Sequence, residues 1–184
     1  MDCSTSSNVP GEGYCHQAVH LEEGMALECG VHIAPLEIAY RTYGKLSQAR
    51  DNAILICHAL TGDQYVAEPH PFTGKPGWWS RMVGPGLPID TDRFFVICSN
   101  VLGGCMGATG PRSICPETGK LCARVSSPTK THDLVAAQAK LNDQLGVGRR
   151  FAVIGGPMGG RQATPWAADF PDLVFAAMPS AACP

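Results

Sequence analysis

Short apolar runs along the chain predict a series of buried strands. Residues 36–42 (LEIAYRT) alternate apolar and polar positions, which is typical of a strand with one buried face. Three continuous apolar runs, at residues 53–57, 94–98 and 151–154, predict strands that are buried on both faces. Strands of this second kind are typical of a parallel sheet covered on its two sides.

Two segments with helical spacing follow these runs. Residues 132–145 (HDLVAAQAKLNDQL) carry apolar side chains at helical intervals, beginning at Thr131 or the turn before it and ending at Gly146. A second helix is expected from residue 158 toward 168, and a further strand at 174–178. Strands alternating with helices favour parallel pairing through right-handed crossovers, so the predicted class is α/β with a mostly parallel sheet.

Long loops are expected from the 15 prolines and 21 glycines, which together form about a fifth of the 184 residues. Residues 61–92 (containing PHPFTGKPGWW) are too long for a plain connection and predict a functional loop with a short helix at 78–83. Residues 103–124 form a second such loop. Residues 1–18 have no basic or apolar signal-peptide region, and we expect a poorly ordered leader there.

Charge and hydropathy exclude two classes of partner. Fourteen Lys and Arg against sixteen Asp and Glu give a net charge of −2, without a basic stripe, so no nucleic-acid partner is expected. No apolar run reaches the roughly 18 residues of a membrane span, so no membrane partner is expected either. The expected location is cytoplasmic.

The nine cysteines favour reduced thiols over disulfides or a metal site. Their number is odd, their spacing is scattered, and no C-x-x-C occurs. Cys115, Cys122 and His132 match zinc-ligand spacing poorly, and no metal is expected. Cys57 and Cys98 lie inside apolar runs, where they are expected to be small core residues.

The segment 153–160 (VIGGPMGG) carries the most specific chemical signal. It follows a predicted strand, opens a predicted helix, and places Gly155 and Gly159 around position 157 as G-x-x-x-G. This is the frame of a nucleophile elbow, in which glycines allow a close approach of strand and helix and the central residue has φ > 0. A phosphate-binding turn is the alternative, but its G-x-G-x-x-G pattern does not fit here.

A second segment, 57–62 (CHALTG), fits the same kind of site. It follows the strand at 53–57, where acyl-transfer enzymes with an elbow place one oxyanion donor, the other being the residue after the nucleophile. The expected donors are the backbone N–H groups of Leu60 and Met158. His58 is interpreted as a loop histidine that fixes local hydrogen bonds, because the hydrolase base comes last in chain order.

Six motifs in order give the chain a family resemblance. They resemble homoserine O-acetyltransferase from about residue 21 to 182, with homoserine O-succinyltransferases and serine O-acetyltransferases of the same superfamily as alternatives. The motifs are residues 39–44 (AYRTYG), 57–63 (CHALTGD), 74–79 (GKPGWW), 89–94 (IDTDRF), 98–105 (CSNVLGGC) and 153–160.

The resemblance implies an α/β-hydrolase-like fold with helices flanking the sheet, and a ping-pong acyl transfer. The family's Ser takes an acetyl group from acetyl-CoA and passes it to L-homoserine, with a His and an Asp activating the Ser. Acetyl-CoA is a co-substrate, and no bound cofactor is expected. Thr61 and Asn100 are expected to bind substrate, and the product feeds methionine biosynthesis. Phe72, Trp78 and Trp79 are expected either to line the substrate entrance or to have a structural role.

The nucleophile position departs from the family, because residue 157 is proline. Proline carries no hydroxyl or thiol and holds φ near −65°, so both the nucleophile and the elbow backbone are predicted to be lost. Ser99 and Cys105 lie on other loops and are not assigned as replacements. Two further departures follow, Pro165 inside the predicted helix and the polar residues Arg161 and Thr164 at apolar family positions.

The extent of the match also departs from the family. It stops at Ala182, near the sixth strand of the family's sheet, so residues 19–184 are expected to be a partial domain without the lid. The family's Asp and His and its homodimer surface are expected beyond Pro184. The main hypothesis is therefore a catalytically defective relative. The alternatives are a superfamily acyltransferase or hydrolase with a rearranged site, or a regulatory fragment that pairs with an intact family member.

Overall fold

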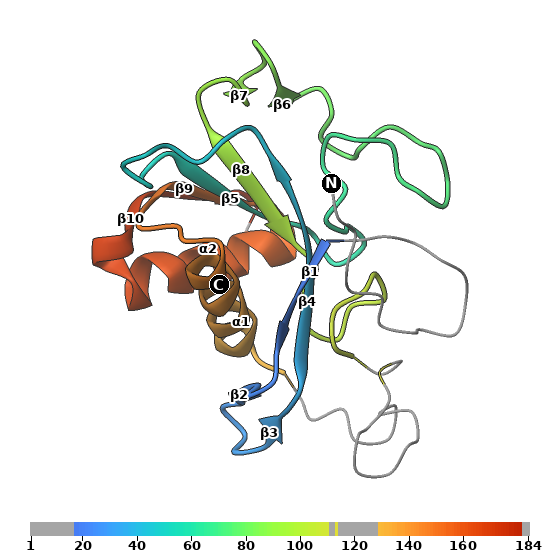
Figure 1. Cartoon of the computed structure of the whole chain (residues 1–184), viewed down its shortest axis with the longest axis vertical. Coiled ribbons are helices and arrows are strands. Elements are labelled where there is room, and N and C mark those ends of the chain that lie inside the picture. The colour runs from blue at the N-terminus through green and yellow to red at the C-terminus, as the bar shows by residue number, and fades with distance from the viewer. Residues whose placement is uncertain (1–16, 111–112, 114–128, 182–184) are drawn as a thin grey trace.

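A six-stranded sheet forms the centre of the structure, a computed structural model that describes residues 17–110, 113 and 129–181 (Figure 1). The strand order is β1-β4-β8-β5-β9-β10. The last four strands run parallel, and β4 is antiparallel to both of its neighbours. The strands are β1 (Gln17–Leu21), β4 (Leu36–Tyr43), β8 (Phe95–Ser99), β5 (Ala53–Cys57), β9 (Arg150–Gly155) and β10 (Val174–Pro179).

The predicted α/β class is confirmed, and the α-helices of the described residues are α1 (Thr131–Gln144) and α2 (Pro157–Asp169). The start of α1 is fixed by Asp133, whose carboxylate accepts the backbone N–H of Lys130 at 2.7 Å and that of Glu28 at 2.8 Å. Gly146 ends it with φ +71°, as the sequence predicted. The remaining elements are two small strand pairs and one turn of 3-10 helix: β2 (Met25–Ala26) with β3 (His32–Ile33), β6 (Val83–Gly84) with β7 (Ile89–Asp90), and η2 (Pro171–Leu173).

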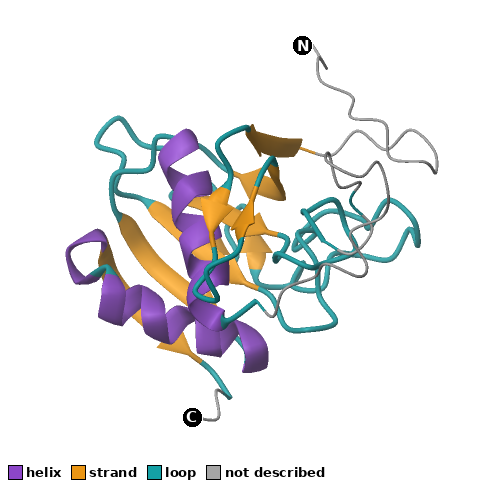
Figure 2. Cartoon of the chain, turned by 90° about the horizontal axis from the view of Figure 1, so that it is seen from below, coloured by secondary structure: helices purple, strands orange, loops and turns teal. Residues whose placement is uncertain are grey.

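Different parts of the chain cover the two faces of the sheet. One core cluster joins β4, β5 and β9 to both helices, with Leu141 of α1 and Trp166 of α2 fully buried against the strands. Figure 2 shows both helices beside the sheet, with most of the loops gathered toward the other side. The second cluster contains no helical residue, because Val66, Val83 and Ile89 cover β5 and β8 there. Cys57 and Cys98 are buried free thiols, as expected.

Two expectations need correction. The short helix predicted at 78–83 is absent, since Trp79 N–H donates to Val66 O at 2.9 Å and the chain turns into β6 instead. Gln17 and Ala18, which were expected to belong to the leader 1–18, pair with β4 as part of β1. Residues 1–16 lie outside the described residues. The second predicted helix is confirmed, and α2 continues past Pro165 to Asp169.

Some predictions fall partly outside the described chain. Cys115, Cys122 and most of the second long loop belong to the segment 114–128, which the structure does not describe. Among the residues that it does describe, none form a group of His, Cys, Asp and Glu able to hold a metal ion. The described helices include none with the length and apolarity needed to cross a membrane.

Candidate functional site

The carboxyl ends of β5 and β9 bring the two predicted site segments together. The strands are parallel neighbours, and Cys57 lies opposite Gly155 in their register. Residues 58–62 and 156–158 therefore leave the sheet at the same edge. The chain places Leu60 and Thr61 on the first segment and Pro157 and Met158 on the second, as the motif predicted.

Glycines allow α2 to approach the sheet at this edge. A Cβ on Gly159 would collide with the carbonyl oxygen of Cys57, and one on Gly155 would collide with the backbone of Gly159. Gly156 lies between them, yet no atom lies within 4 Å of the place where its Cβ would be. Two of the three glycines are thus required by backbone contacts, which confirms the close approach expected for this turn.

The turn itself is relaxed and does not have elbow geometry. Gly156 precedes α2 with φ −87° and ψ −175°, and Pro157 is the first residue of the helix. No residue from 155 to 158 has a positive φ. Proline is favoured at the first helical position, where its missing N–H would have no partner. The predicted loss of the elbow backbone is therefore confirmed, because the chain adopts an ordinary helix start at Pro157.

The two expected oxyanion donors lie in the first turn of α2 and in the turn after β5. The N–H of Met158 belongs to the first turn of α2, where N–H groups lack intrahelical partners. Leu60 lies in the turn after β5, and its side chain is 79% exposed. Their pairing as an oxyanion hole stays a prediction.

His58 is a buried residue with a local hydrogen bond. Its Nδ1 lies 2.7 Å from the carbonyl oxygen of Ala59, and its Nε2 is buried without a partner among the described residues. Burial lowers the pKa of the imidazole, which favours the neutral ring. This arrangement fits the local role expected from the sequence.

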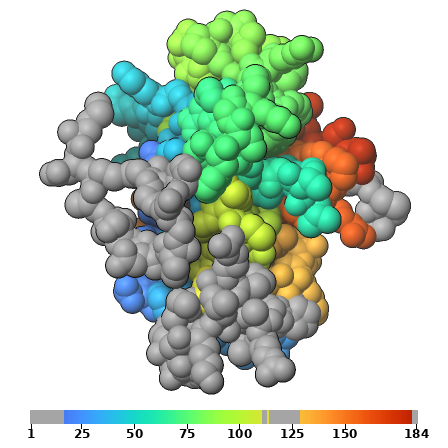
Figure 3. All heavy atoms as spheres, turned by 90° about the vertical axis from the view of Figure 1, so that its right-hand side faces the viewer, coloured from blue at the N-terminus to red at the C-terminus, as the bar shows by residue number. Residues whose placement is uncertain are grey.

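Asn100 lies at the carboxyl end of β8 within a buried amide cluster. Its Nδ2 donates to Gln64 Oε1 at 3.0 Å, and Gln64 Nε2 donates to Met106 O at 2.9 Å. These bonds tie loop 58–94 to loop 100–110, and Figure 3 shows the green 60–90 segment directly above the yellow-green 100–110 segment. Thr61 is exposed in the turn after β5. Substrate binding by Thr61 and Asn100 stays a prediction.

The aromatic residues of the long loop make structural contacts. The Trp78 indole N–H donates to Asp63 O at 2.9 Å, and Trp78 and Trp79 stack with ring centroids 5.4 Å apart. His70 Nε2 lies 3.1 Å from the Asp63 carboxylate. These bonds fix the loop, so the structural role proposed for the two tryptophans has direct support.

The other nucleophilic side chains around this edge are poorly placed for acyl transfer. Burial raises the pKa of the Cys57 thiol to about 12, so the reactive thiolate is almost absent at neutral pH. Ser99 is buried, and its hydroxyl has no partner among the described residues. Cys105 is exposed on a different loop.

A buried polar network beneath the site escaped the sequence analysis. Gln138 of α1 donates to Gln162 of α2 at 2.7 Å and accepts the indole N–H of Trp166 at 2.8 Å. Gln162 also donates to the carbonyl oxygen of Met158 at 3.5 Å. The network fixes the first turn of α2 against α1. The only sequence signal for this network was the presence of polar residues at helical positions that are usually apolar. From the sequence alone such residues cannot be told apart from polar residues on an exposed helix face.

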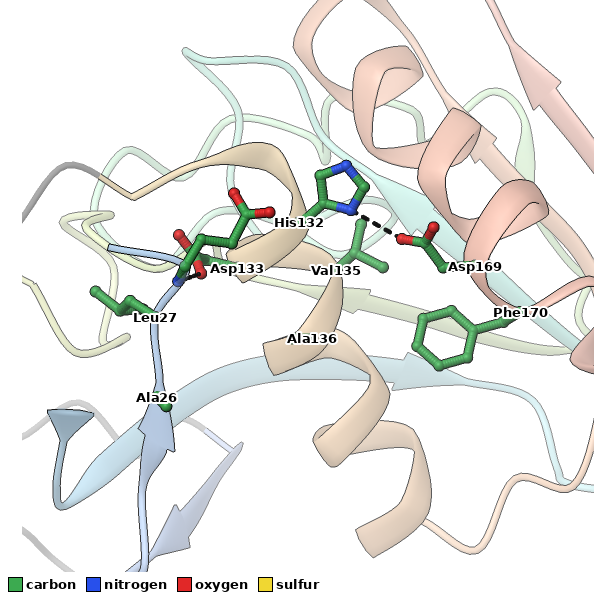
Figure 4. A pocket seen from close by; sticks show the side chains of 9 residues that line it. Ala26, Leu27, His132, Asp133, Val135, Ala136, Asp169 and Phe170 are labelled. Atoms are coloured by element: carbon green, nitrogen blue, oxygen red, sulfur yellow. Dashed lines mark hydrogen bonds and ion pairs between the residues drawn. The ribbon is translucent and has the colours of Figure 1, made fainter. Parts of the chain in front are cut away.

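A cavity of about 330 Å³ lies elsewhere, between the start of α1, the end of α2 and the segment after β2 (Figure 4). Its polar groups are paired with one another, since His132 Nδ1 lies 2.8 Å from Asp169 Oδ2 and Asp133 accepts two backbone N–H groups. Asp169 is at the opposite end of α2 from Pro157, roughly 18 Å away by helix geometry. The cavity is therefore separate from the predicted acyl-transfer edge.

Comparisons with known proteins agree with this geometry. A family profile described as alpha/beta hydrolase fold matches residues 52–182. The chain is 71% identical to the homoserine O-acetyltransferase of Gluconobacter oxydans (strain 621H) over 185 residues, which is 100% of this chain and 47% of that protein. It thus spans about half the length of the curated relatives that it matches.

Solved structures are also similar to this chain in both fold and sequence. The homoserine O-acetyltransferase from Bacillus anthracis superposes with a TM-score of 0.81 and 34% identity, over 88% of this chain and 44% of the other. Esterase E22 superposes with a TM-score of 0.78 and 34% identity, over 86% of this chain and 45% of the other.

Proposed function

Because the chain belongs to the α/β-hydrolase fold family, we propose that it is a homoserine O-acetyltransferase-like domain in which the acyl-enzyme step is lost. Acetyl-CoA and L-homoserine are the substrates of the related activity, which belongs to methionine biosynthesis in the cytoplasm. The observation that carries the proposal is Pro157 at the first position of α2. An acyl group needs a side-chain oxygen or sulfur there, and proline offers neither.

The parts that would act around the nucleophile support descent from an acyltransferase. The close contact of Gly159 with the end of β5 fits such a site, and the register of β5 and β9 brings the segment after β5 to the edge where α2 begins. Two backbone N–H groups at such a place stabilise the oxyanion of a tetrahedral intermediate. Without a nucleophile between them, these groups have no covalent intermediate to stabilise.

A transfer assay tests the proposal directly. We expect no transfer of acetyl from acetyl-CoA to L-homoserine above the background rate, for the wild type or for Pro157→Ser. The serine variant is expected to fail because the turn lacks a positive φ and all six histidines of this chain precede position 157. Turnover by the wild type would overturn the proposal. Turnover by Pro157→Ser alone would show that the missing hydroxyl is the only defect.

Partner binding is the second candidate function, and one observation favours it. β10 is an edge strand of the sheet, and within the described chain it pairs only with β9. Phe175 and Met178 on this strand are 66% and 57% exposed, and no charged residue protects the edge. Co-purification with a full-length homoserine O-acetyltransferase tests the idea, and its repeated absence would reject it.

A further inference from the structure

The imidazole ring of His70 connects two parts of loop 58–94 through its two nitrogens. Nε2 lies 3.1 Å from the carboxylate of Asp63, and Nδ1 accepts the backbone N–H of Phe72 at 3.2 Å. The ring also contacts the rings of Tyr65 and Phe72, whose centroids are 5.2 Å and 5.7 Å away. The side chains of His70 and Asp63 are therefore mostly buried, with 18% and 15% exposed.

The bond from Phe72 determines where the ring carries its proton. A backbone N–H can only donate, so Nδ1 must keep its lone pair. The proton of the neutral ring is then on Nε2, beside the Asp63 carboxylate, and this tautomer suits both contacts. The doubly protonated ring suits only one of them. Its Nδ1–H would face the N–H of Phe72, whereas its positive charge would attract Asp63.

Asp63 is held in place independently of the His70 ring. Its Oδ1 accepts the backbone N–H of Tyr65 at 2.8 Å. Its backbone carbonyl oxygen accepts the indole N–H of Trp78 at 2.9 Å. Asp63 can therefore keep its position whichever protonation state the ring adopts.

The turn at 70–75 also has bonds that do not involve the ring. Gly74 N–H donates to the carbonyl oxygen of His70 at 2.8 Å, and His70 N–H donates to that of Lys75 at 2.8 Å. Loss of the bond to Nδ1 therefore frees the Phe72 N–H without opening the whole turn. Because the Phe72 side chain is 56% exposed, such a change alters the surface of the loop.

The other charged and titratable groups near the ring are paired, neutral or exposed. Arg41 of β4 lies 5.2 Å from the Tyr65 centroid and pairs with Glu68 at 2.6 Å, so the two charges offset each other. Burial raises the pKa of the Tyr65 phenol and lowers that of the nearby His58, which favours the neutral form of both. Lys75 is exposed. Among the described residues, Asp63 is the carboxylate that makes an ion pair with His70.

We propose that His70 is a pH-sensitive switch for the turn at 70–75. The neutral ring holds the Phe72 backbone through Nδ1. A proton taken from solvent at Nδ1 breaks this hydrogen bond and strengthens the contact of the ring with Asp63. Histidine is the side chain whose charge ordinarily changes between about pH 5 and 8, so the switch operates in that range.

Nuclear magnetic resonance of the 184-residue chain tests the proposal. At about pH 8, proton–nitrogen correlation spectra of the ring are expected to place the His70 proton on Nε2. As the pH decreases to about 5, the exchange protection of the Phe72 N–H is expected to fall about five-fold, the change for loss of one ordinary hydrogen bond. The Gly74 N–H is the internal control, and its protection should not change, because its bond does not use the ring.

Three variants separate the switch from a general effect of pH. His70→Ala is expected to lower Phe72 protection at both pH values, whereas His32→Gln, at an exposed position, should leave the transition unchanged. Asp63→Asn keeps an oxygen for the Tyr65 N–H but removes the negative charge, so the release of Phe72 should move to lower pH.

Four results would overturn the proposal. The first is a proton on Nδ1 of His70 at about pH 8, and the second is Phe72 protection that does not depend on pH. The third is loss of Gly74 protection in parallel with that of Phe72, because the whole turn would then open. The fourth is an unchanged transition in Asp63→Asn, because the charge of Asp63 would then have no part in it.

Discussion

Arg150 carries a buried charge whose desolvation opposes folding. Its side chain is 1% exposed, and all three guanidinium nitrogens lack a hydrogen-bond partner among the described residues. Its guanidinium lies 4.6 Å from the Trp166 centroid, and this contact offsets only part of the desolvation cost. Burial lowers the pKa of the guanidinium, which is the expected sign for a charge without adequate compensation.

Replacing this charge should stabilise the protein. Arg150→Leu is expected to raise the free energy of unfolding by about 1–4 kcal/mol, because it removes a buried charge whose guanidinium has no hydrogen-bond partner among the described residues and is offset only by the exposed Asp143 carboxylate. Arg161→Leu, at an exposed position of α2, should change it by no more than about 0.5 kcal/mol. Urea unfolding of the two variants measures the difference. A loss of stability in Arg150→Leu would mean that the contact with Trp166 outweighs desolvation.

His58 should make stability depend on pH. Burial holds the pKa of the folded imidazole below its ordinary value of 6.5, so the unfolded chain binds the proton more readily. Stability is therefore expected to fall as the pH decreases through about 6.5 toward the lower pKa of the folded state. His58→Gln should flatten this part of the profile, whereas His32→Gln, at an exposed position, should not. An unchanged slope in His58→Gln would contradict this role.

Helix α2 shows how an element can accommodate two prolines. Pro157 occupies the first helical position, where it is favoured. Pro165 lies inside the helix and removes its hydrogen bond to the Arg161 carbonyl, a position that usually costs about 3 kcal/mol. The helix nevertheless continues, since Trp166 is fully buried one residue later. Arg161 and Thr164 are exposed, so neither polar residue is forced into the core.

The contact between α2 and β5 gives a prediction at the same scale. Gly159→Ala is expected to destabilise the fold by about 3 kcal/mol, because its Cβ would meet the Cys57 carbonyl group and backbone must move. Gly156→Ala is the matched control, since its Cβ would have open space and its φ is −87°. Thermal unfolding compares the two. Equal effects would show that α2 does not pack against β5 as described.

Elements with a simple pattern could be predicted from the sequence, and those that depend on distant contacts could not. The apolar run at 53–57 became β5 with the same bounds, and the helical spacing at 132–145 placed α1 within one residue at each end. The run at 151–154 gave β9 without Arg150, because a charged residue joins the strand only through the bulge opposite β5. The helix expected at 78–83 is wrong, because backbone bonds from Trp78 to Tyr65 and from Trp79 to Val66 hold that segment as turns.

In the candidate site too, features set by the local sequence pattern could be predicted, and those that depend on distant contacts could not. Sequence spacing predicted which segments meet, since strand order and register place Cys57 opposite Gly155. The fixed φ of proline also predicted that the elbow backbone is lost at position 157, and the turn there has no positive φ. The sequence analysis missed the Gln138–Gln162–Trp166 network, since amides that pair inside the protein have the same sequence signature as exposed ones.

The whole molecule presents an α/β-hydrolase framework in which proline occupies position 157 at the start of α2. The sheet order, the close approach at Gly159 and the similarity to homoserine O-acetyltransferases all point to the same ancestry. The residue at the centre of that framework supplies no nucleophile, and the nearest buried thiol, that of Cys57, has its pKa raised to about 12.

Trapping of the acyl-enzyme tests the central claim most directly. The 184-residue chain is incubated with acetyl-CoA, quenched in acid, and analysed by intact-mass and peptide mass spectrometry. We predict no stoichiometric acetylation of any side chain around the carboxyl ends of β5 and β9, with acetyl-CoA alone or after addition of L-homoserine. One acetyl group per chain at a single residue of that edge, removed when L-homoserine is added, would contradict the account.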